Sequence, residues 1–138
     1  MKSFLPLKNI NIVDLTKVLS GPFATLVLGD LGANVIKVEQ PKGDDSRQFG
    51  PFVKNKSCYF ISLNRGKKSI VLNLKNKKDK KIFIKLLSKS DILVENYKPK
   101  TLSKLGFSWK KIKRKFPRLV YAKISGFGES GSLSHLPA

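Results

Sequence analysis

Residues 10–39 read INIVDLTKVLSGPFATLVLGDLGANVIKVE, and this stretch decides the fold. Its first five residues and residues 34–39 are rich in Val and Ile, as short buried strands are. Between them, the Ser-Gly-Pro of residues 20–22 is typical of a helix start, because proline fits the first helical position. Gly32 supplies the left-handed conformation that ends such a helix. A strand, a helix and a strand in this order predict two parallel strands joined by a right-handed crossover.

The rest of the chain continues this alternation. Thr101 and Ser108 are expected helix N-caps, residues 40–56 are expected to form a loop, and residues 57–63 fit either a helix or a strand. The remaining predicted elements are strands at residues 69–74, 92–95 and 119–124 and helices at residues 77–88 and 109–116. We therefore predict an α/β fold, with a mostly parallel sheet flanked by helices.

Composition excludes several classes of protein. The chain has 138 residues, of which 41% are hydrophobic, enough for one packed domain. No apolar run approaches the roughly 20 residues needed to span a bilayer, and the first residues lack the cleavage site of a secretory signal. Cys58 is the only cysteine, so no internal disulfide can form. We expect a cytoplasmic protein with no membrane contact.

The net charge is +19, from 28 Lys and Arg against 9 Asp and Glu. Such a charge suits nucleic-acid binding, which is driven by phosphate neutralisation. The charge is, however, spread along the chain. In its densest part, residues 75–85, the spacing predicts a helix with an apolar inner face and a solvated lysine face. We therefore favour a solvated surface and expect no nucleic-acid partner. A small basic nucleic-acid-binding protein is the alternative, and a salt titration of binding would separate the two.

Seven sequence motifs follow one another along almost the whole chain. They are IVDLT with SGP (residues 12–16 and 20–22), LGDLGANVIKVE (28–39), GDDSR (43–47), NRGKKSI (64–70), VENY (94–97), LGF (105–107) and SGFGESG (125–131). In this order and spacing the chain resembles the class III CoA transferases, also called the CaiB/BaiF family, which includes the formyl-CoA and carnitine CoA-transferases. Each motif alone is weak, whereas seven in register are specific.

The resemblance implies a fold, a reaction and partners. The family has a Rossmann-like large domain and forms interlocked homodimers. Its members move CoA from an acyl-CoA to a carboxylic acid without a metal. An aspartate carboxylate attacks the thioester, giving a mixed anhydride and then an enzyme-bound CoA thioester, which is nucleophilic catalysis. CoA, as acyl-CoA, is thus the expected ligand, and a carboxylic acid is the second substrate.

The resemblance also implies which residues contact CoA. Lysines would hold its phosphates, because these need cations; an aliphatic and an aromatic side chain would flank the adenine, and an amide would bond the linker. The expected phosphate partners are Lys75 and Lys104, the side chains beside the adenine are those of Leu72 and Tyr97, and the amide is that of Asn96. Val18 and Gln40 are expected to make further contacts. Each residue also has a simpler interpretation, since a lysine in this chain is usually solvated and a tyrosine after a strand often only packs.

None of the nine Asp and Glu residues matches the family's nucleophile, which the resemblance places beyond residue 138. We therefore expect no catalytic residue here. Residues 1–138 would be the N-terminal, truncated portion of the large domain, inactive alone. Three positions depart from the family. Ser132 stands where the family usually has proline. Leu19 replaces a glutamine associated with oxalate in formyl-CoA transferase, which suits a different acid. Lys100 replaces a glycine where a tight turn is expected.

Two enzyme alternatives stay open. An α-methylacyl-CoA racemase, from the same superfamily, would use a histidine at the position after Ala138, but Pro137-Ala138 is more typical of the transferases. A Rossmann NAD-binding domain would use Glu39, which ends the second predicted strand, to bind a ribose. The G-x-G-x-x-G turn that binds its pyrophosphate is missing, which argues against this alternative.

Overall fold

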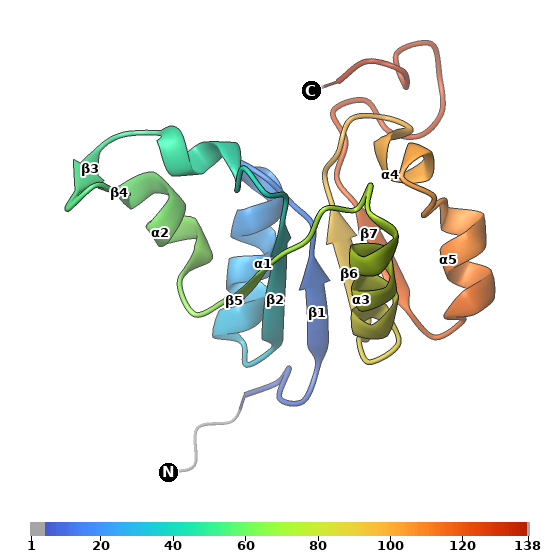
Figure 1. Cartoon of the computed structure of the whole chain (residues 1–138), viewed down its shortest axis with the longest axis horizontal. Coiled ribbons are helices and arrows are strands. Elements are labelled where there is room, and N and C mark those ends of the chain that lie inside the picture. Colours follow the sequence, from blue (N-terminus) through green and yellow to red (C-terminus); the bar gives the residue numbers. More distant parts are fainter. Residues whose placement is uncertain (1–4, 138) are drawn as a thin grey trace.

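A computed structural model describes residues 5–137, and its centre is a five-stranded parallel sheet (Figure 1). The strand order is β5–β2–β1–β6–β7, and every neighbouring pair in this sheet is parallel. The strands are β1 (Asn11–Asp14), β2 (Asn34–Glu39), β5 (Lys68–Val71), β6 (Ile92–Glu95) and β7 (Val120–Lys123). The predicted α/β fold with a mostly parallel sheet is confirmed.

The strand order reverses direction at the centre of the sheet. From β1 the chain builds outward through β2 and β5, and it then returns to place β6 and β7 on the other side of β1. The loops that follow β1 and β6 therefore diverge, and in open α/β sheets ligands bind at such a point.

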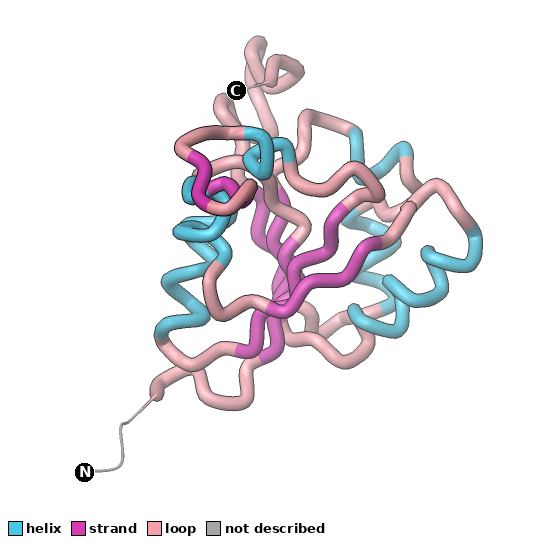
Figure 2. The backbone as a smooth tube through the Cα atoms, turned by 60° about the vertical axis from the view of Figure 1, so that its left-hand side comes forward, coloured by secondary structure: helices cyan, strands magenta, loops and turns pink. Residues whose placement is uncertain are grey.

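Helices cover both faces of the sheet (Figure 2). They are α1 (Ser20–Asp30), α2 (Cys58–Asn64), α3 (Lys77–Leu87), α4 (Thr101–Lys104) and α5 (Trp109–Lys115). The helices α3, α4 and α5 pack on one face, whereas α1 packs on the other and α2 lies against α1. Among the described residues, no helix has both the length and the apolar character needed to cross a bilayer.

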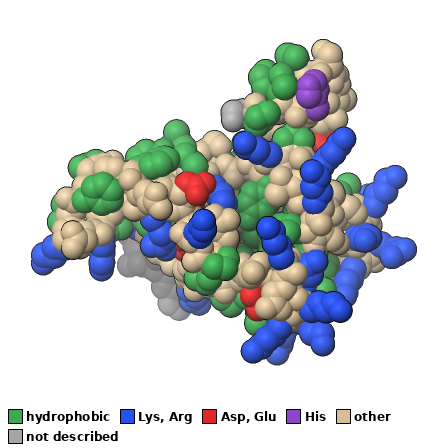
Figure 3. Space-filling view, turned by 45° about the horizontal axis from the view of Figure 1, so that its top comes forward, with side chains coloured by type: hydrophobic (Ala, Val, Ile, Leu, Met, Phe, Trp, Pro, Cys, Tyr) green, Lys and Arg blue, Asp and Glu red, His purple; other side chains and the backbone are tan. Residues whose placement is uncertain are grey.

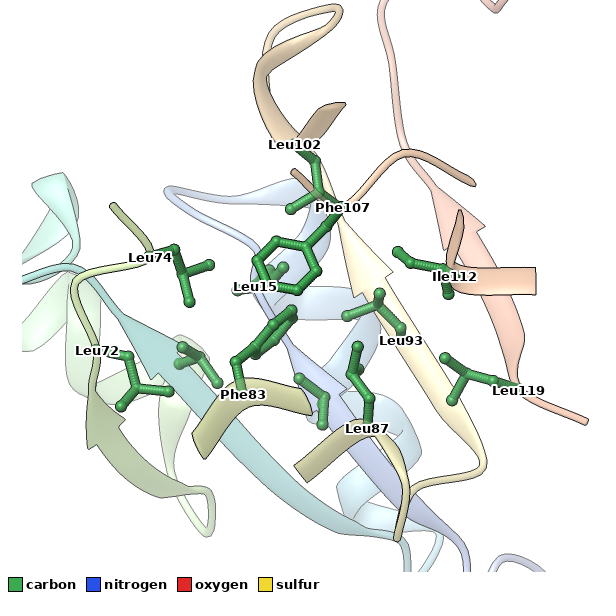
Figure 4. Packing of buried hydrophobic residues seen from close by; sticks show 12 residues of the cluster. Leu15, Leu72, Leu74, Phe83, Leu87, Leu93, Leu102, Phe107, Ile112 and Leu119 are labelled. Atoms are coloured by element: carbon green, nitrogen blue, oxygen red, sulfur yellow. The ribbon is translucent and has the colours of Figure 1, made fainter. Parts of the chain in front are cut away.

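The larger core lies beneath α3, α4 and α5. Phe83 of α3 is fully buried and meets Phe107 edge to face, with ring centroids 4.9 Å apart. Figure 4 shows these rings among leucines from β6, from α3 and α4, and from the segments that flank the strands. The cluster consists of Val13, Leu15, Val38, Leu72, Leu74, Phe83, Leu87, Leu93, Leu102, Phe107, Ile112 and Leu119. The core under α1 is smaller, with Ile12, Val35 and Val94 as its buried residues.

The structure differs from the prediction in several details of its helices and loops. Residues 57–63 contribute to helix α2, which Ser57 caps by accepting a hydrogen bond from the Phe60 N–H (3.0 Å). The predicted loop at residues 40–56 contains the 3₁₀ helix η1 (Asp45–Gln48) and the hairpin strands β3 (Phe52–Val53) and β4 (Lys56–Ser57), the latter ending one residue beyond it. Helix α1 already begins at Ser20, which puts its proline at the third helical position.

The N-cap predictions had mixed outcomes. Ser108 is the N-cap of α5, although its side chain makes no capping hydrogen bond. The prediction for Thr101 is wrong, because Thr101 is the first helical residue and Lys100 is the cap. Lys100 has a φ of 63°, so the tight turn expected at this position forms with a lysine in a conformation that favours glycine.

Candidate functional site

A cleft of about 1100 Å³ lies at the carboxyl ends of the strands. Loops that follow β1, β2, β5, β6 and β7 all contribute to its wall. Figure 3 shows a hollow with hydrophobic side chains at its centre and Lys or Arg side chains at its margin. This is the place at which the reversed strand order predicts a ligand.

Six of the seven predicted CoA contacts line this cleft. They are Val18, Gln40, Leu72, Lys75, Asn96 and Tyr97. Lys104 is not part of the lining, because Thr101 and Leu105 are the residues near α4 that face the cleft, while Lys104 is exposed. The structure thus brings together residues that are almost 80 positions apart in the sequence.

Sequence analysis missed three cations of the cleft, which are Lys17, Lys42 and Lys98. Two of them stand directly beside a predicted contact, Lys17 before Val18 and Lys98 after Tyr97. The signal available in the sequence was that these two lysines lie in the loops that follow β1 and β6. It was weak, since lysine is frequent throughout the chain.

Asn96 joins the two loops that diverge at the centre of the sheet. Its Oδ1 accepts from the Lys17 N–H (2.8 Å), and its Nδ2 donates to the Lys17 carbonyl oxygen (2.9 Å). This pair of hydrogen bonds links the loop after β6 to the loop after β1. Asn96 therefore shapes the cleft, and one amide N–H is left over for a ligand.

Tyr97 is a neutral phenol in the wall of the cleft. Burial raises the pKa of Tyr97 to about 12, and the carboxylate of Glu95 adds to this rise. Its hydroxyl therefore stays protonated at neutral pH and can donate a hydrogen bond. The ammonium group of Lys17 lies 6.0 Å from the centroid of the ring. The ring thus has an apolar face beside a cation, which suits a flat base near a phosphate.

Two buried Lys–Asp ion pairs lie behind the cleft on the α1 side of the sheet. Lys67 Nζ lies 3.0 Å from Asp14 Oδ2, and Lys37 Nζ lies 2.9 Å from Asp44 Oδ2. Burial lowers the pKa of Lys67, while Asp14 opposes that shift. For Asp44, burial favours a higher pKa, but the contacts with Lys37 and Ser46 outweigh it and hold the pKa below its usual value. These pairs were not predicted.

Both carboxylate oxygens of Glu39 are also hydrogen-bonded within the protein. Arg47 donates to both of its carboxylate oxygens, from Nε and Nη2, each at 2.7 Å, and Ser69 donates to Oε1 at 2.7 Å. Burial favours a higher pKa for Glu39, yet the Arg47 and Ser69 hydrogen bonds hold that pKa below its ordinary value. The oxygens that an NAD-binding domain would offer to a ribose are therefore already bonded.

Few acidic groups reach the cleft. Among the described residues that line it, the carboxylates are those of Glu39 and Asp45, and Asp45 lies 3.8 Å from Lys17 Nζ with its side chain 61% exposed. Within residues 5–137, no group of three or more His, Cys, Asp and Glu side chains is placed to hold a metal ion. The described charged side chains that line the cleft are thus mostly cationic, with four lysines against two carboxylates.

Sequence comparison places these features in a family. The family model described as CoA-transferase family III matches residues 7–138. Acetyl-CoA:oxalate CoA-transferase of Acetobacter aceti is 49% identical over 134 residues, which are 96% of this chain and 34% of that protein. Succinyl-CoA:glutarate CoA-transferase of Homo sapiens is 48% identical over 136 residues, which are 97% of this chain and 31% of that protein.

Structural comparison agrees. A CaiB/BaiF family protein from Brucella suis superimposes with a TM-score of 0.90 at 36% identity, covering 96% of this chain and 36% of that one. The chain therefore spans about a third of the length of the relatives it matches. The match over nearly all of the chain, at these identities, shows that it belongs to CoA-transferase family III.

Proposed function

We propose that this chain binds CoA in the cleft, as part of an enzyme that moves CoA from an acyl-CoA to a free carboxylic acid. The observation that supports this most is that six positions expected to contact CoA, from loops far apart in the sequence, surround one cleft. That cleft lies at the carboxyl ends of a parallel sheet, where such folds bind nucleotides. Both named sequence relatives are CoA transferases.

The charges of the cleft suit the nucleotide half of CoA. Its pyrophosphate and 3′-phosphate need cations, and Lys17, Lys42, Lys75 and Lys98 all line the cleft. Leu72 and the ring of Tyr97 offer apolar surface for the adenine. Lys75 remains the proposed phosphate partner, whereas the exposed Lys104 is no longer the best candidate for the second one.

The nucleophile is proposed to lie outside these 138 residues. In the proposed reaction an aspartate attacks the thioester carbonyl, which gives a mixed anhydride and releases the CoA thiolate. The thiolate then attacks the aspartyl carbonyl, which frees the donor acid and leaves an enzyme-bound CoA thioester. Neither carboxylate of the cleft suits this role, because Glu39 is bonded to Arg47 and Asp45 is mostly exposed. The chain alone is therefore expected to bind CoA without completing transfer.

The acceptor is proposed to be a dicarboxylic acid, because oxalate and glutarate are the acids named for the two relatives. Those relatives are transferases, which favours transfer over racemisation. An interlocked homodimer in the cytoplasm stays part of this proposal. So does the absence of a metal and of a nucleic-acid partner.

Calorimetric titration of the 138-residue chain with CoA tests the proposal. Binding is expected for the wild type, and Lys75→Ala is expected to weaken it about ten-fold, since a hydrogen bond to a charged group is worth about 1.5–3 kcal/mol. Lys104→Ala is the matched control, because it removes the same charge outside the cleft. It is expected to change the affinity less than about two-fold.

The proposal fails if the wild-type chain does not bind CoA, or if the two lysine variants weaken binding equally. Dephospho-CoA, which lacks the 3′-phosphate, gives a second measurement, and its affinity should depend less on the ionic strength. Incubation with an acyl-CoA and a panel of acids, followed by mass spectrometry, tests the chemistry. A new thioester would contradict the placement of the nucleophile outside the chain.

A further inference from the structure

The ion pair of Lys37 and Asp44 is buried directly behind the wall of the cleft. Lys37 belongs to β2 and Asp44 to the loop that follows it, and their side chains are only 2% and 1% exposed. Taking two charges out of water is costly, and well-packed apolar side chains usually stabilise a fold at least as well. The pair is therefore better explained by what it holds in place than by its contribution to stability.

Both members of the pair also bind the backbone of the loop after β1. Lys37 Nζ donates to the Thr16 carbonyl oxygen at 2.8 Å. Asp44 Oδ1 accepts from the Val18 N–H at 3.2 Å and from the Ser46 N–H at 3.0 Å. Its other oxygen, Oδ2, accepts no well-directed hydrogen bond from a described residue, and its charge is met by Lys37. The pair thus connects the loop after β2 to residues 16–18.

Val18 is the strained point of that loop. Its φ is 65°, in the left-handed region, where a β-branched residue is a rare outlier. Such a conformation persists only when the surroundings impose it. Val18 lines the cleft and is one of the predicted CoA contacts.

The strained loop is held on both sides by side chains from elsewhere in the sheet. Lys37 and Asp44 hold Thr16 and Val18 from the β2 side, and Asn96 holds Lys17 from the β6 side. These bonds fix the backbone at three successive residues that begin the wall of the cleft. The loop has no regular structure of its own, so its shape depends on these contacts.

We propose that Lys37 and Asp44 are positioning residues for CoA: they hold Val18 in its left-handed conformation and so fix the cleft wall between β1 and β2. This inference rests on the proposed function in one respect, which is that CoA is the ligand of the cleft. The loop geometry itself can be tested without any ligand.

The main experiment replaces both charges at once in the 138-residue chain, as Lys37→Met with Asp44→Ala. Removing a whole buried pair is often neutral for stability, whereas removing one partner is not. Because Asp44→Ala also removes the acceptor of the Val18 and Ser46 N–H groups, the melting temperature is expected to fall, but by less than in a variant that removes one charge alone. Amide hydrogen exchange at Val18, measured without ligand, should accelerate about a hundred-fold, as local opening becomes easier. The Kd for CoA is expected to rise about ten-fold.

Adding Val18→Gly to this double variant supplies a rescue. Glycine adopts the left-handed conformation without strain, so it should recover part of the lost affinity. The control replaces the exposed pair of Arg65 and Asp30, as Arg65→Met with Asp30→Ala, which is outside the cleft lining and should leave the Kd and Val18 exchange unchanged.

The outcomes separate the two proposals. Absence of CoA binding by the wild type would end the proposed function, while faster exchange at Val18 in the double variant would still show that Lys37 and Asp44 hold Val18 in place. Unchanged exchange at Val18 would overturn the positioning role whatever the affinity. A lower melting temperature with unchanged exchange and Kd would mean that the pair only stabilises the fold.

If the double variant does not fold, Asp44→Asn gives the test with one atom changed and the size of the side chain kept; it is expected to be less stable than the wild type, because Lys37 loses its counter-charge. It removes the charge that faces Lys37 and weakens the acceptor for the Val18 N–H, so faster exchange at Val18 and weaker CoA binding are expected. Wild-type values for both would overturn the inference.

Discussion

The two faces of the sheet are built from different chemistry. The face beneath α3, α4 and α5 buries a continuous apolar cluster around Phe83. The face beneath α1 buries fewer apolar residues and carries Asp14, Lys37 and Glu39 toward the carboxyl ends of its strands. Because successive side chains of a strand point to opposite faces, β1 sends Val13 into the apolar cluster and Asp14 into the charged region. One face chiefly holds the domain together, and the other chiefly shapes the cleft.

The outer surfaces differ as well. Helix α3 presents lysines to solvent, whereas α1 presents a line of apolar side chains spaced four residues apart. Leu19, Phe23, Val27 and Leu31 are 41–55% exposed, and none of them belongs to either core cluster among the described residues. The two helices therefore offer phenylalanines in opposite settings, Phe83 buried and Phe23 exposed.

Replacing these two phenylalanines should give the largest difference between the faces. Phe83→Ala is expected to lower the free energy of unfolding by about 3–5 kcal/mol, because it leaves a cavity next to Phe107. Phe23→Ala, the matched control, should change it by less than about 0.5 kcal/mol. Urea denaturation of both variants provides the measurement. Equal losses would mean that the α1 side is packed as fully as the α3 side.

The apolar face beneath α3, α4 and α5 could be predicted in part from the sequence. The helical spacing in residues 77–88 predicted an apolar inner face, and the structure buries Phe83 and Leu87 there. Residues 57–63 could not be assigned to a helix or a strand from the sequence, because a short apolar run fits the periods of both. Their assignment depends on a cap, the Ser57 hydroxyl, which the apolar pattern does not contain.

Breaking one charged pair should have the next largest effect. Lys67→Met leaves Asp14, which is fully buried, without its counter-charge, and the expected loss is about 3 kcal/mol in the free energy of unfolding. Arg65→Met, which breaks an exposed pair with Asp30, is the neighbouring control and should cause no measurable change. Thermal and urea unfolding would show the contrast. Asp14 also accepts hydrogen bonds from the Thr16 N–H (2.8 Å) and the Thr25 hydroxyl (2.6 Å), and a stable Lys67→Met variant would indicate that these bonds satisfy it alone.

The buried charged residues of the face beneath α1 could not be predicted from the sequence in the same way. The family resemblance identified six residues of the cleft lining, because a motif fixes positions in the sequence even where no local pattern marks them. The partners of Asp14 and Lys37 follow from tertiary contacts across 53 and 7 residues, and a lysine among so many gives no local signal that it is buried. Lys104 lies outside the cleft lining for a related reason, since a motif gives the sequence position but not the side of a short helix that faces the cleft.

The smallest effect in this series is the dependence of stability on pH. The folded protein holds the pKa values of Glu39 and Asp44 below their ordinary values of about 4.3 and 3.9, so between the folded and unfolded values the unfolded chain binds more protons. Stability from these groups is therefore present above about pH 4 and is lost as the pH falls through the folded values. The slope is at most about 1.4 kcal/mol per pH unit for each carboxylate.

Urea denaturation between pH 3 and pH 7 measures this slope. Glu39→Gln removes one titrating group of the charged face, so its profile should be flatter than that of the wild type over the acidic range. Asp45→Asn is the control, because that carboxylate is mostly exposed, and it should leave the wild-type profile unchanged. A Glu39→Gln profile as steep as the wild type would mean that acid destabilises the protein through groups outside the charged face. The inference that the face beneath α1 carries the acid-sensitive groups would then be wrong.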